Sequence, residues 1–436
     1  MTDQQGPQLP VDPAAWARGM TSRRMSRRQM IRYAGMSVGT LSMASILAAC
    51  GGDDDPGPGA TDGPAPDGSM PDYSATPGTT VNFSNWPLYI DRARDPDTGE
   101  RYSPSIRQFE EETGITIAYN DEINDNAGFF GELVPQLSAG QDVGRDIIVI
   151  TNGREFSALT QNGWVHELDP AMRPNFDANA AAWAKDPAFD PGNRFSMAWQ
   201  SGLTGIGYNT ELVNGPITKL DDLMNSDLTG TNAVGVLKAD GPDLAMINLG
   251  IDPTTSGPEE WQAAADWLRM LRDSDSFRNA TDQGYIDDMT AGNISAFMAW
   301  SGDVLYYALW EDYPFEFIVP EGGALLWIDN MLIPTNAANP AGALQAMDYY
   351  YRPEVAQLVT EWVLYMSPVP EVQQLIAAHA EEESGAYAAA LEATAQNEFL
   401  WPDDDLLGQV SFGRQLTTDD EAAEWDGIFL PVWEGQ

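Results

Sequence analysis

The sequence predicts an α/β protein with two lobes, each a sheet flanked by helices, and a ligand cleft between the lobes. The length of 436 residues allows two or three domains, and a hydrophobic content of 43% is enough for sizeable cores. Short apolar segments alternate with amphipathic ones near residue 80 and again after residue 230, as in sheets covered by helices. Two such lobes usually bind a ligand between them, at the carboxyl ends of strands.

Capping residues and alternating apolar side chains predict the first elements of the folded body. Residues 80–83 read as a strand. Ser103 is a suitable helix N-cap, Pro104 fits the first helical position, and Gly114 ends that helix. Residues 115–119 alternate apolar and polar side chains and predict the next strand.

A second helix is expected from Asn126, which can cap it, although Pro135 would distort its later part. Its apolar residues recur at helical spacing: Phe129, Phe130, Leu133 and Leu137. Residues 146–150 then form a continuous apolar strand. The order strand, helix, strand, helix, strand implies a parallel sheet with both faces covered.

The middle of the chain repeats this style. We expect strands at 233–237, 296–300 and 315–319, and helices at about 340–351 and 353–364. A further helix after Pro258 has one apolar face that should pack on a sheet, made of Trp261, Ala264, Ala265, Leu268 and Leu271.

These elements predict how the chain is divided. The first lobe comprises residues 79–207 and 331–385, and the second comprises residues 208–330 and 386–436. Residues 51–78 are rich in Gly, Pro and Asp with few bulky apolar side chains, and read as a disordered tether.

Residues 1–50 resemble the twin-arginine export signal of a lipoprotein. Arg27 and Arg28 precede an apolar stretch at 33–47, which is too short and too polar for a stable membrane span. The stretch ends in Cys50 after Leu-Ala-Ala, as in a bacterial lipobox. Such a cysteine is lipidated and would hold the protein at the outer face of the cytoplasmic membrane. An accidental cysteine after an apolar run is the alternative.

Charge and composition exclude several functions. Against 22 basic side chains stand 66 acidic ones, a net charge of −44, which repels nucleic acid and anionic membranes and attracts small cations. An acidic surface that only keeps the protein soluble in salt remains an equal alternative. Cys50 is the single cysteine, and His166 and His379 are the two histidines. Disulfides, zinc sites and histidine-based triads are therefore poor candidates, and we expect no metal and no cofactor.

Aromatic and acidic side chains recur where the predicted strands end. Rings offer a π-face and carboxylates a charge-assisted acceptor, the two groups that hold an organic ammonium ion. Packing roles for the tryptophans, and helix capping by the two aspartates near residue 240, are the plainer alternatives. The candidate ligand-binding residues are Trp86, Tyr89, Asp240, Asp243, Trp300, Trp327, Asp329 and Tyr365.

Trp327 and Asp329 form the most informative pair. They are separated by Ile328, so in extended backbone both side chains point to the same side. The Gly-Gly pair at 322–323 lacks the spacing, the lysine and the following helix of a phosphate loop.

Over residues 80–370 the chain resembles the periplasmic polyamine-binding proteins, the spermidine/putrescine receptors of ABC importers. Matching segments occur in the family's order: Asn85-Trp86 with Tyr89, 109–115, 205–209, 321–329, 333–337 and 350–356. The resemblance implies a periplasmic-binding-protein fold of type II-like architecture and no catalysis. It further implies a polyamine ligand, putrescine or spermidine, a membrane permease as partner, a monomer, and membrane contact through the lipid anchor alone.

Carried over residue by residue, the resemblance assigns roles. Trp86 and Tyr89 become aromatic residues of the first lobe's side of the cleft. Asp240, Asp243 and Asp329 become partners of the amino groups. Three further rings become walls for the methylene chain: Trp300, Trp327 and Tyr365.

The chain also departs from the family. An acidic residue is usual where Leu88 stands, and a tyrosine near Gly153. The site for one terminal amine is therefore lost or rebuilt, with Asp121, Glu122 or Asp125 as possible substitutes. A final glutamine contact has two candidates, Gln409 and Gln415.

Two other functions remain open at this point. The ligand could be another small organic cation, a sugar or an iron complex. An enzyme of another class, a hydrolase using a carboxylate pair from Asp240, Asp243 and Asp329, would need one carboxyl of raised pKa.

Overall fold

The computed structural model describes residues 70–434. The export signal with Arg27, Arg28 and Cys50, and most of the expected tether, lie outside the described residues. Within the described range, residues 93–101 group apart from the main body, which comprises residues 70–92 and 102–434. Two short strands, β2 (Ala93–Arg94) and β3 (Arg101–Tyr102), pair with each other.

A single mixed sheet organises the main body. Its strand order is β4-β1-β5-β11-β6-β9-β7-β8, with β10 beside β6 and β12 beside β11. We call β1 (Thr80–Asn85), β4 (Thr116–Asp121) and β5 (Ile147–Thr151) the first strand group; they are parallel, as predicted. We call β7 (Val234–Leu237), β8 (Phe277–Thr281) and β9 (Ala296–Trp300) the second strand group, which is also parallel.

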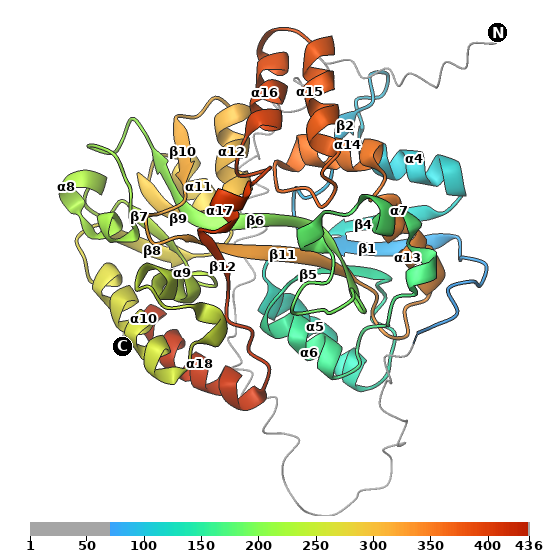
Figure 1. Cartoon of the computed structure of the whole chain (residues 1–436), viewed down its shortest axis with the longest axis horizontal. Coiled ribbons are helices and arrows are strands. Elements are labelled where there is room, and N and C mark those ends of the chain that lie inside the picture. The colour runs from blue at the N-terminus through green and yellow to red at the C-terminus, as the bar shows by residue number, and fades with distance from the viewer. Residues whose placement is uncertain (1–69, 435–436) are drawn as a thin grey trace, which may run out of the picture. The chain divides into compact units, whose positions relative to one another are not determined.

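Two long strands connect these groups. β6 (Ser196–Asn209) and β11 (Ala324–Leu332) are antiparallel to each other, and each extends from one group to the other (Figure 1). β11 pairs with β5 of the first group and β6 with β9 of the second. β10 (Phe315–Ile318) and β12 (Val410–Phe412) add to this connection.

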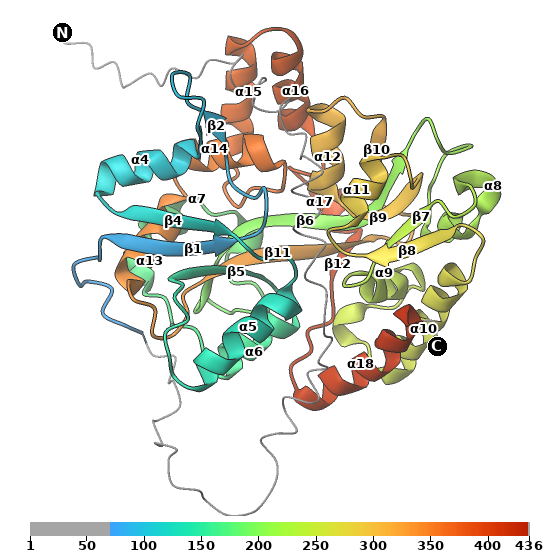
Figure 2. The same cartoon turned by 180° about the vertical axis from the view of Figure 1, so that it is seen from behind.

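Helices cover both faces of the sheet (Figures 1 and 2). Those beside the first strand group are α4 (Pro104–Thr113), α5 (Asn126–Ser138), α6 (Arg154–Gln161), α7 (Pro174–Asn179), α13 (Pro340–Tyr349) and α14 (Pro353–Val363). Those beside the second are α9 (Gly241–Asn248), α10 (Pro258–Arg272), α11 (Tyr285–Thr290), α12 (Ser301–Leu309) and α18 (Asp419–Trp433). A hairpin of α15 (Val372–Glu382) and α16 (Gly385–Gln396), together with the short helices α8 (Ser226–Thr229) and α17 (Asp404–Leu407), completes the set.

Local sequence explains most helix ends. The Ser103 hydroxyl accepts a hydrogen bond from the Ile106 N–H, and Gly114 follows α4 in the left-handed conformation at φ 73°, both as predicted. The expected cap of α5 was wrong by one residue. Asp125 accepts from the Gly128 N–H, and Asn126 begins the helix.

Packing of apolar faces explains the helices in the middle of the chain, such as α10. The predicted face of α10 is buried, and the Trp261 ring meets Trp425 of α18 edge to face, with ring centroids 5.4 Å apart. Several strand and helix limits differ from expectation by one or two residues, since end residues are set by pairing partners rather than by local sequence.

Two other features bear on organisation. Residues 70–78 were counted in the tether from their composition, but Tyr73 is buried and its hydroxyl donates to the Glu167 carbonyl at 3.0 Å. Between residues 70 and 434, the helices are all too short or too polar to cross a membrane.

Candidate ligand-binding site

Asp240 lies between β7 and α9, immediately before α9, and its side chain does not cap that helix. Its carboxylate instead accepts hydrogen bonds from the Thr204 hydroxyl at 2.5 Å and from the Trp300 indole N–H at 2.8 Å. Burial raises the pKa of this carboxyl group. The capping alternative is therefore wrong for Asp240, and the residue joins strands β6, β7 and β9 at one place.

Thr204 extends this network to β11. The Trp327 indole N–H donates to the Thr204 hydroxyl oxygen at 3.2 Å, while the same hydroxyl donates to Asp240. Thr204 is fully buried in the middle of β6. A side chain that sequence reasoning did not select thus fixes one ring and one carboxylate relative to each other.

Asp329 lies two residues after Trp327 and is only 5% exposed. The Thr151 hydroxyl, at the end of β5, donates to it at 2.6 Å. Burial raises the Asp329 pKa to about 6. The Tyr89 hydroxyl faces this carboxylate without a well-aligned hydrogen bond, and burial together with the Asp329 charge raises the Tyr89 pKa.

Tyr365 stands between the other rings. Its ring centroid is 5.4 Å from that of Tyr89, nearly perpendicular, and 5.4 Å from that of Trp327. Two glycines make this close packing possible, because a Cβ at Gly202 would come within 2.5 Å of Trp327, and one at Gly302 within 2.6 Å of Tyr365. The rings therefore pack directly against backbone.

Asp303 is a carboxylate that sequence reasoning missed. It accepts hydrogen bonds from the Tyr365 hydroxyl at 3.0 Å and the buried Tyr285 hydroxyl at 2.7 Å. Burial raises its pKa to about 6. Its position three residues after Trp300, in the first turn of α12, was the available signal, since a strand end delivers both side chains to one edge.

Asp243 lies in the first turn of α9, and the charge of Asp240 adds to the effect of burial in raising its pKa. The Arg414 backbone N–H donates to it at 3.0 Å, and burial raises its pKa to about 7. Of the two glutamine candidates, Gln415 is adjacent to this contact and has a buried amide oxygen without a partner. Gln409 is exposed and donates to the Asp405 carbonyl.

Trp86 stands apart from these contacts. It follows β1 and has a buried indole N–H without a hydrogen-bond partner. Among the described residues, no hydrogen bond or ring contact joins its side chain to the carboxylates. Leu88 is 46% exposed at positive φ, and Gly153 has φ 144°, a value that disfavours the tyrosine usual in the family.

The possible acidic substitutes on this side differ in their partners. Asp121 pairs with Arg92 at 2.8 Å, and Glu122 pairs with Arg145 at 2.9 Å. Asp125 is exposed and caps α5. None of the three repeats the half-buried arrangement without a basic partner that is found after β7 and β9.

Four acidic side chains thus share one property. Within residues 70–434, none of them forms an ion pair with a basic side chain; the Arg414 charge lowers the Asp243 pKa slightly, but its guanidinium pairs with Glu421 at 2.7 Å. These four are Asp240, Asp243, Asp303 and Asp329. Groups of acidic or histidine side chains arranged to hold a metal ion are absent from the described part of the chain. The arrangement suits an organic cation, because buried carboxylates require a compensating charge.

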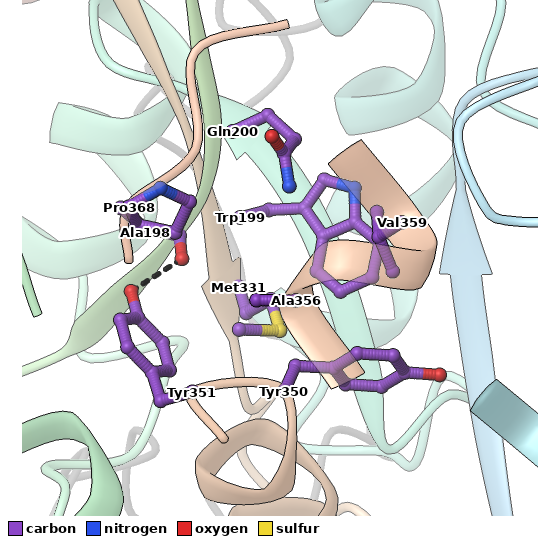
Figure 3. A pocket seen from close by; sticks show the side chains of 9 residues that line it. All are labelled: Ala198, Trp199, Gln200, Met331, Tyr350, Tyr351, Ala356, Val359 and Pro368. Carbon is purple, nitrogen blue, oxygen red and sulfur yellow. Dashed lines mark hydrogen bonds between the residues drawn. The ribbon is translucent and has the colours of Figure 1, made fainter. Parts of the chain in front are cut away.

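The pocket drawn in Figure 3 is a different feature. It lies between β6, β11 and α14, and its lining includes Trp199, Met331 and Val359 but no carboxylate. The Tyr351 hydroxyl donates to the Ala198 carbonyl at its edge. This pocket is a gap in the packing beside the long strands.

Comparison with known proteins identifies the family of this chain. The family model of the bacterial extracellular solute-binding proteins matches residues 145–407. The chain belongs to this family. Its members bind solutes and are not enzymes, and the family assignment places this chain among extracytoplasmic binding proteins of ABC transporters.

The named relatives of this solute-binding protein are all described as polyamine-binding proteins. The spermidine/putrescine-binding periplasmic protein of Salmonella typhimurium is 24% identical over 317 residues, covering 72% of this chain and 85% of the relative. The putrescine-binding periplasmic protein PotF of Escherichia coli is 28% identical over 334 residues, covering 71% and 84%.

Solved structures show the fold. The spermidine/putrescine substrate-binding protein PotD of Streptococcus pneumoniae superposes with a TM-score of 0.64 at 21% identity, covering 81% of this chain and 98% of that structure. The predicted fold class, a two-lobed α/β periplasmic binding protein, is confirmed, with a central sheet flanked by helices.

Proposed function

We propose that this solute-binding protein captures a polyamine, putrescine or spermidine, and delivers it to the permease of an ABC importer. One observation carries the proposal: four carboxylates without a basic partner, of which Asp329 is buried and the other three are half-buried, occur with aromatic rings in edge-to-face and tilted contact. An ionised carboxylate away from water is costly unless a cation meets it. Ammonium groups supply that charge and donate up to three hydrogen bonds each.

The rings define the rest of the ligand. Trp327 and Tyr365 offer apolar faces for methylene groups, and a π-face close to a nitrogen adds cation–π attraction. A neutral sugar would use the rings but leave the carboxylates uncompensated. The names of the relatives, which specify spermidine and putrescine, support the amine.

The proposed site residues retain the roles expected from sequence. Asp240, Asp243 and Asp329 receive amino groups, and Asp303 joins them. The aromatic residues form the walls: Trp86, Tyr89, Trp300, Trp327 and Tyr365.

We assign the lobes as predicted, with residues 79–207 and 331–385 in the first lobe and 208–330 and 386–436 in the second. The separate parallel strand groups support this division. A ligand held between such lobes stabilises their closed arrangement, since the open one makes fewer contacts with it. Binding and release then suffice, with no chemical step, and the protein works as a monomer without a cofactor.

We further propose that Cys50 carries the lipid anchor at the outer face of the membrane and that Arg27 and Arg28 direct export. Cys50→Ser should release the protein from membranes or leave it unprocessed, which cell fractionation and mass spectrometry measure. Exchange of both arginines for lysine should retain the precursor in the cell. Unchanged membrane association and unchanged export would contradict the two assignments.

Calorimetry with matched ligands tests the polyamine proposal. Putrescine and spermidine should bind, whereas 1,4-butanediol, which has the length of putrescine without its charge, and maltose should not. The difference follows from the charge-assisted hydrogen bonds that only the amines make. Equal binding of the diol, or sugar binding without amine binding, would overturn the proposal.

A further inference from the structure

A second set of acidic residues lies outside the carboxylate cluster, and we call it the acidic rim: Asp125, Glu155, Asp282 and Asp426. Asp282 accepts from the backbone N–H groups of Lys238 and Ala239, directly before Asp240, and its charge raises the Asp240 pKa. The rim is therefore continuous with the site already described.

The rim is assembled from both strand groups. Asp125 caps α5 and Glu155 is in the first turn of α6, beside the first group. Asp282 follows β8, and Asp426 is on α18, which packs on α10 beside the second group. The Asp125 charge raises the Asp282 pKa, and the Asp125 and Asp426 charges raise the Glu155 pKa, in each case after burial as the larger cause. The hydrogen bonds from Arg154 of α6 to Asp426 of α18 join the two sides of this rim.

Arg154 places a positively charged guanidinium group among these acidic side chains. Its Nη1 donates to both carboxylate oxygens of Asp426, at 3.0 and 3.1 Å, although the residues are 272 positions apart. The side chains are 23% and 32% exposed, so the pair is partly withdrawn from water. Arg154 also lowers the Glu155 pKa, which burial as the larger effect raises.

The position of Arg154 relates it to the ligand. It begins α6 three residues after Thr151, whose hydroxyl holds Asp329. A polyamine with amino groups at the carboxylate cluster and a longer chain would extend toward the rim, where acidic side chains would suit one more ammonium group. Arg154 already supplies a positive charge there.

We propose that Arg154 is a specificity-determining residue: held by Asp426, its guanidinium occupies the acidic position that a third ammonium group would need, so that the site takes diamines in preference to triamines. This inference rests on the polyamine function proposed above. It assigns to Asp426 a positioning role, since Asp426 acts on the ligand only through Arg154.

Three variants test the proposal by calorimetry with putrescine and spermidine. Arg154→Gln removes the charge but keeps a polar side chain, and it should raise spermidine affinity relative to putrescine affinity by about fivefold, the effect of one partly exposed charge. Arg145→Gln is the matched control, because Arg145 is also 23% exposed and pairs with Glu122 inside the first strand group. It should leave the ratio unchanged.

The exchanged pair Arg154→Asp with Asp426→Arg separates charge from structure. The double variant returns a cation to the rim, now carried by α18. The ratio of spermidine affinity to putrescine affinity should therefore return to within about twofold of the native value. An unchanged ratio in Arg154→Gln, an equal change in Arg145→Gln, or no recovery in the exchanged pair would overturn the inference. If the native protein binds neither amine, the proposed function itself has failed, which is a distinguishable result.

Discussion

The carboxylates at the ends of the first and second strand groups differ in what they contact. At the end of β4, Asp121 pairs with Arg92 at 2.8 Å and Glu122 pairs with Arg145 at 2.9 Å. After β7, Asp240 receives two neutral donors, a hydroxyl and an indole N–H, and no basic side chain. Both regions are acidic ends of parallel strand groups in one mixed sheet, yet the carboxylates of the first are paired with arginine and Asp240 of the second is not.

This difference shows where a ligand is needed. An ion-paired acid near the surface is already compensated and adds little to stability. A buried acid that receives only neutral donors keeps much of its desolvation cost, which the raised pKa values of Asp243, Asp303 and Asp329 express. The second strand group and β11 therefore hold the charge available to a cation.

The largest effect is expected from a change to Asp240, a carboxylate without a basic partner. Asp240→Asn keeps the shape of the side chain but removes its charge, and polyamine affinity should fall by roughly a hundredfold, since charge-assisted hydrogen bonds contribute about 1.5–3 kcal/mol each. Calorimetry measures the loss.

Asp121→Asn is the matched change on the paired side. It should alter affinity by less than about twofold, because Asp121 is compensated by Arg92. Equal losses in the two variants would remove the distinction between the regions.

The next effect is a pH dependence. The pKa values of Asp303 and Asp329 are about 6 and that of Asp243 about 7, all above the ordinary value of a carboxyl group. Protons therefore compete with the ligand as pH falls, and affinity should drop by roughly tenfold or more from pH 8 to pH 5.

Stability without ligand should change in the opposite direction. A carboxyl group whose folded pKa is raised stabilises the fold while it is protonated, and that contribution is lost as pH rises from about 4 to about 7. Thermal unfolding should show a larger ligand-induced shift at pH 8 than at pH 5. A constant dissociation constant over this range would show that the carboxylates are ionised before the ligand arrives.

A smaller effect concerns the rings. The Cβ of Gly302→Ala would lie within 2.6 Å of Tyr365, so the ring must move and its bond to Asp303 must lengthen. Affinity should fall by about fivefold, as overpacking of this kind costs about 1–3 kcal/mol.

Gly427→Ala in α18 is the control, since nothing lies within 4 Å of its added Cβ. It should raise the unfolding temperature slightly, because alanine favours helix over glycine, and leave binding intact. If both glycine variants bind like the native protein, Tyr365 has more freedom than its packing indicates.

Local sequence was sufficient to predict the elements that have clear capping residues or an alternating apolar pattern, such as α4 between Ser103 and Gly114. It also selected Asp240 and Asp329, because strand ends place side chains at one edge and the resemblance assigned the same residues. Thr204 and Tyr285 could not be found in this way. Their importance depends on partners 36 and 18 positions away, which no local pattern encodes.

The strand β6 was the main element missed. It is buried along all 14 residues, so it lacks the alternation of a half-exposed strand. Glycine is unfavourable inside a strand, yet in this sheet the glycines at 202, 205 and 207 admit the rings of Trp327, Phe317 and Phe297. Their meaning comes from tertiary packing.

The attachment of Tyr365 to β6 has a consequence for binding entropy. Ser201 and Met366 exchange backbone hydrogen bonds at 3.0 and 2.8 Å, and Leu364 turns the chain into this bridge with φ 56°. With its hydroxyl held by Asp303, the Tyr365 ring has little rotational freedom left to lose. Immobilising such a side chain on binding otherwise opposes association by about 0.5–1.5 kcal/mol. A site with freely rotating rings would bind the same cation more weakly, even with identical contacts in the complex.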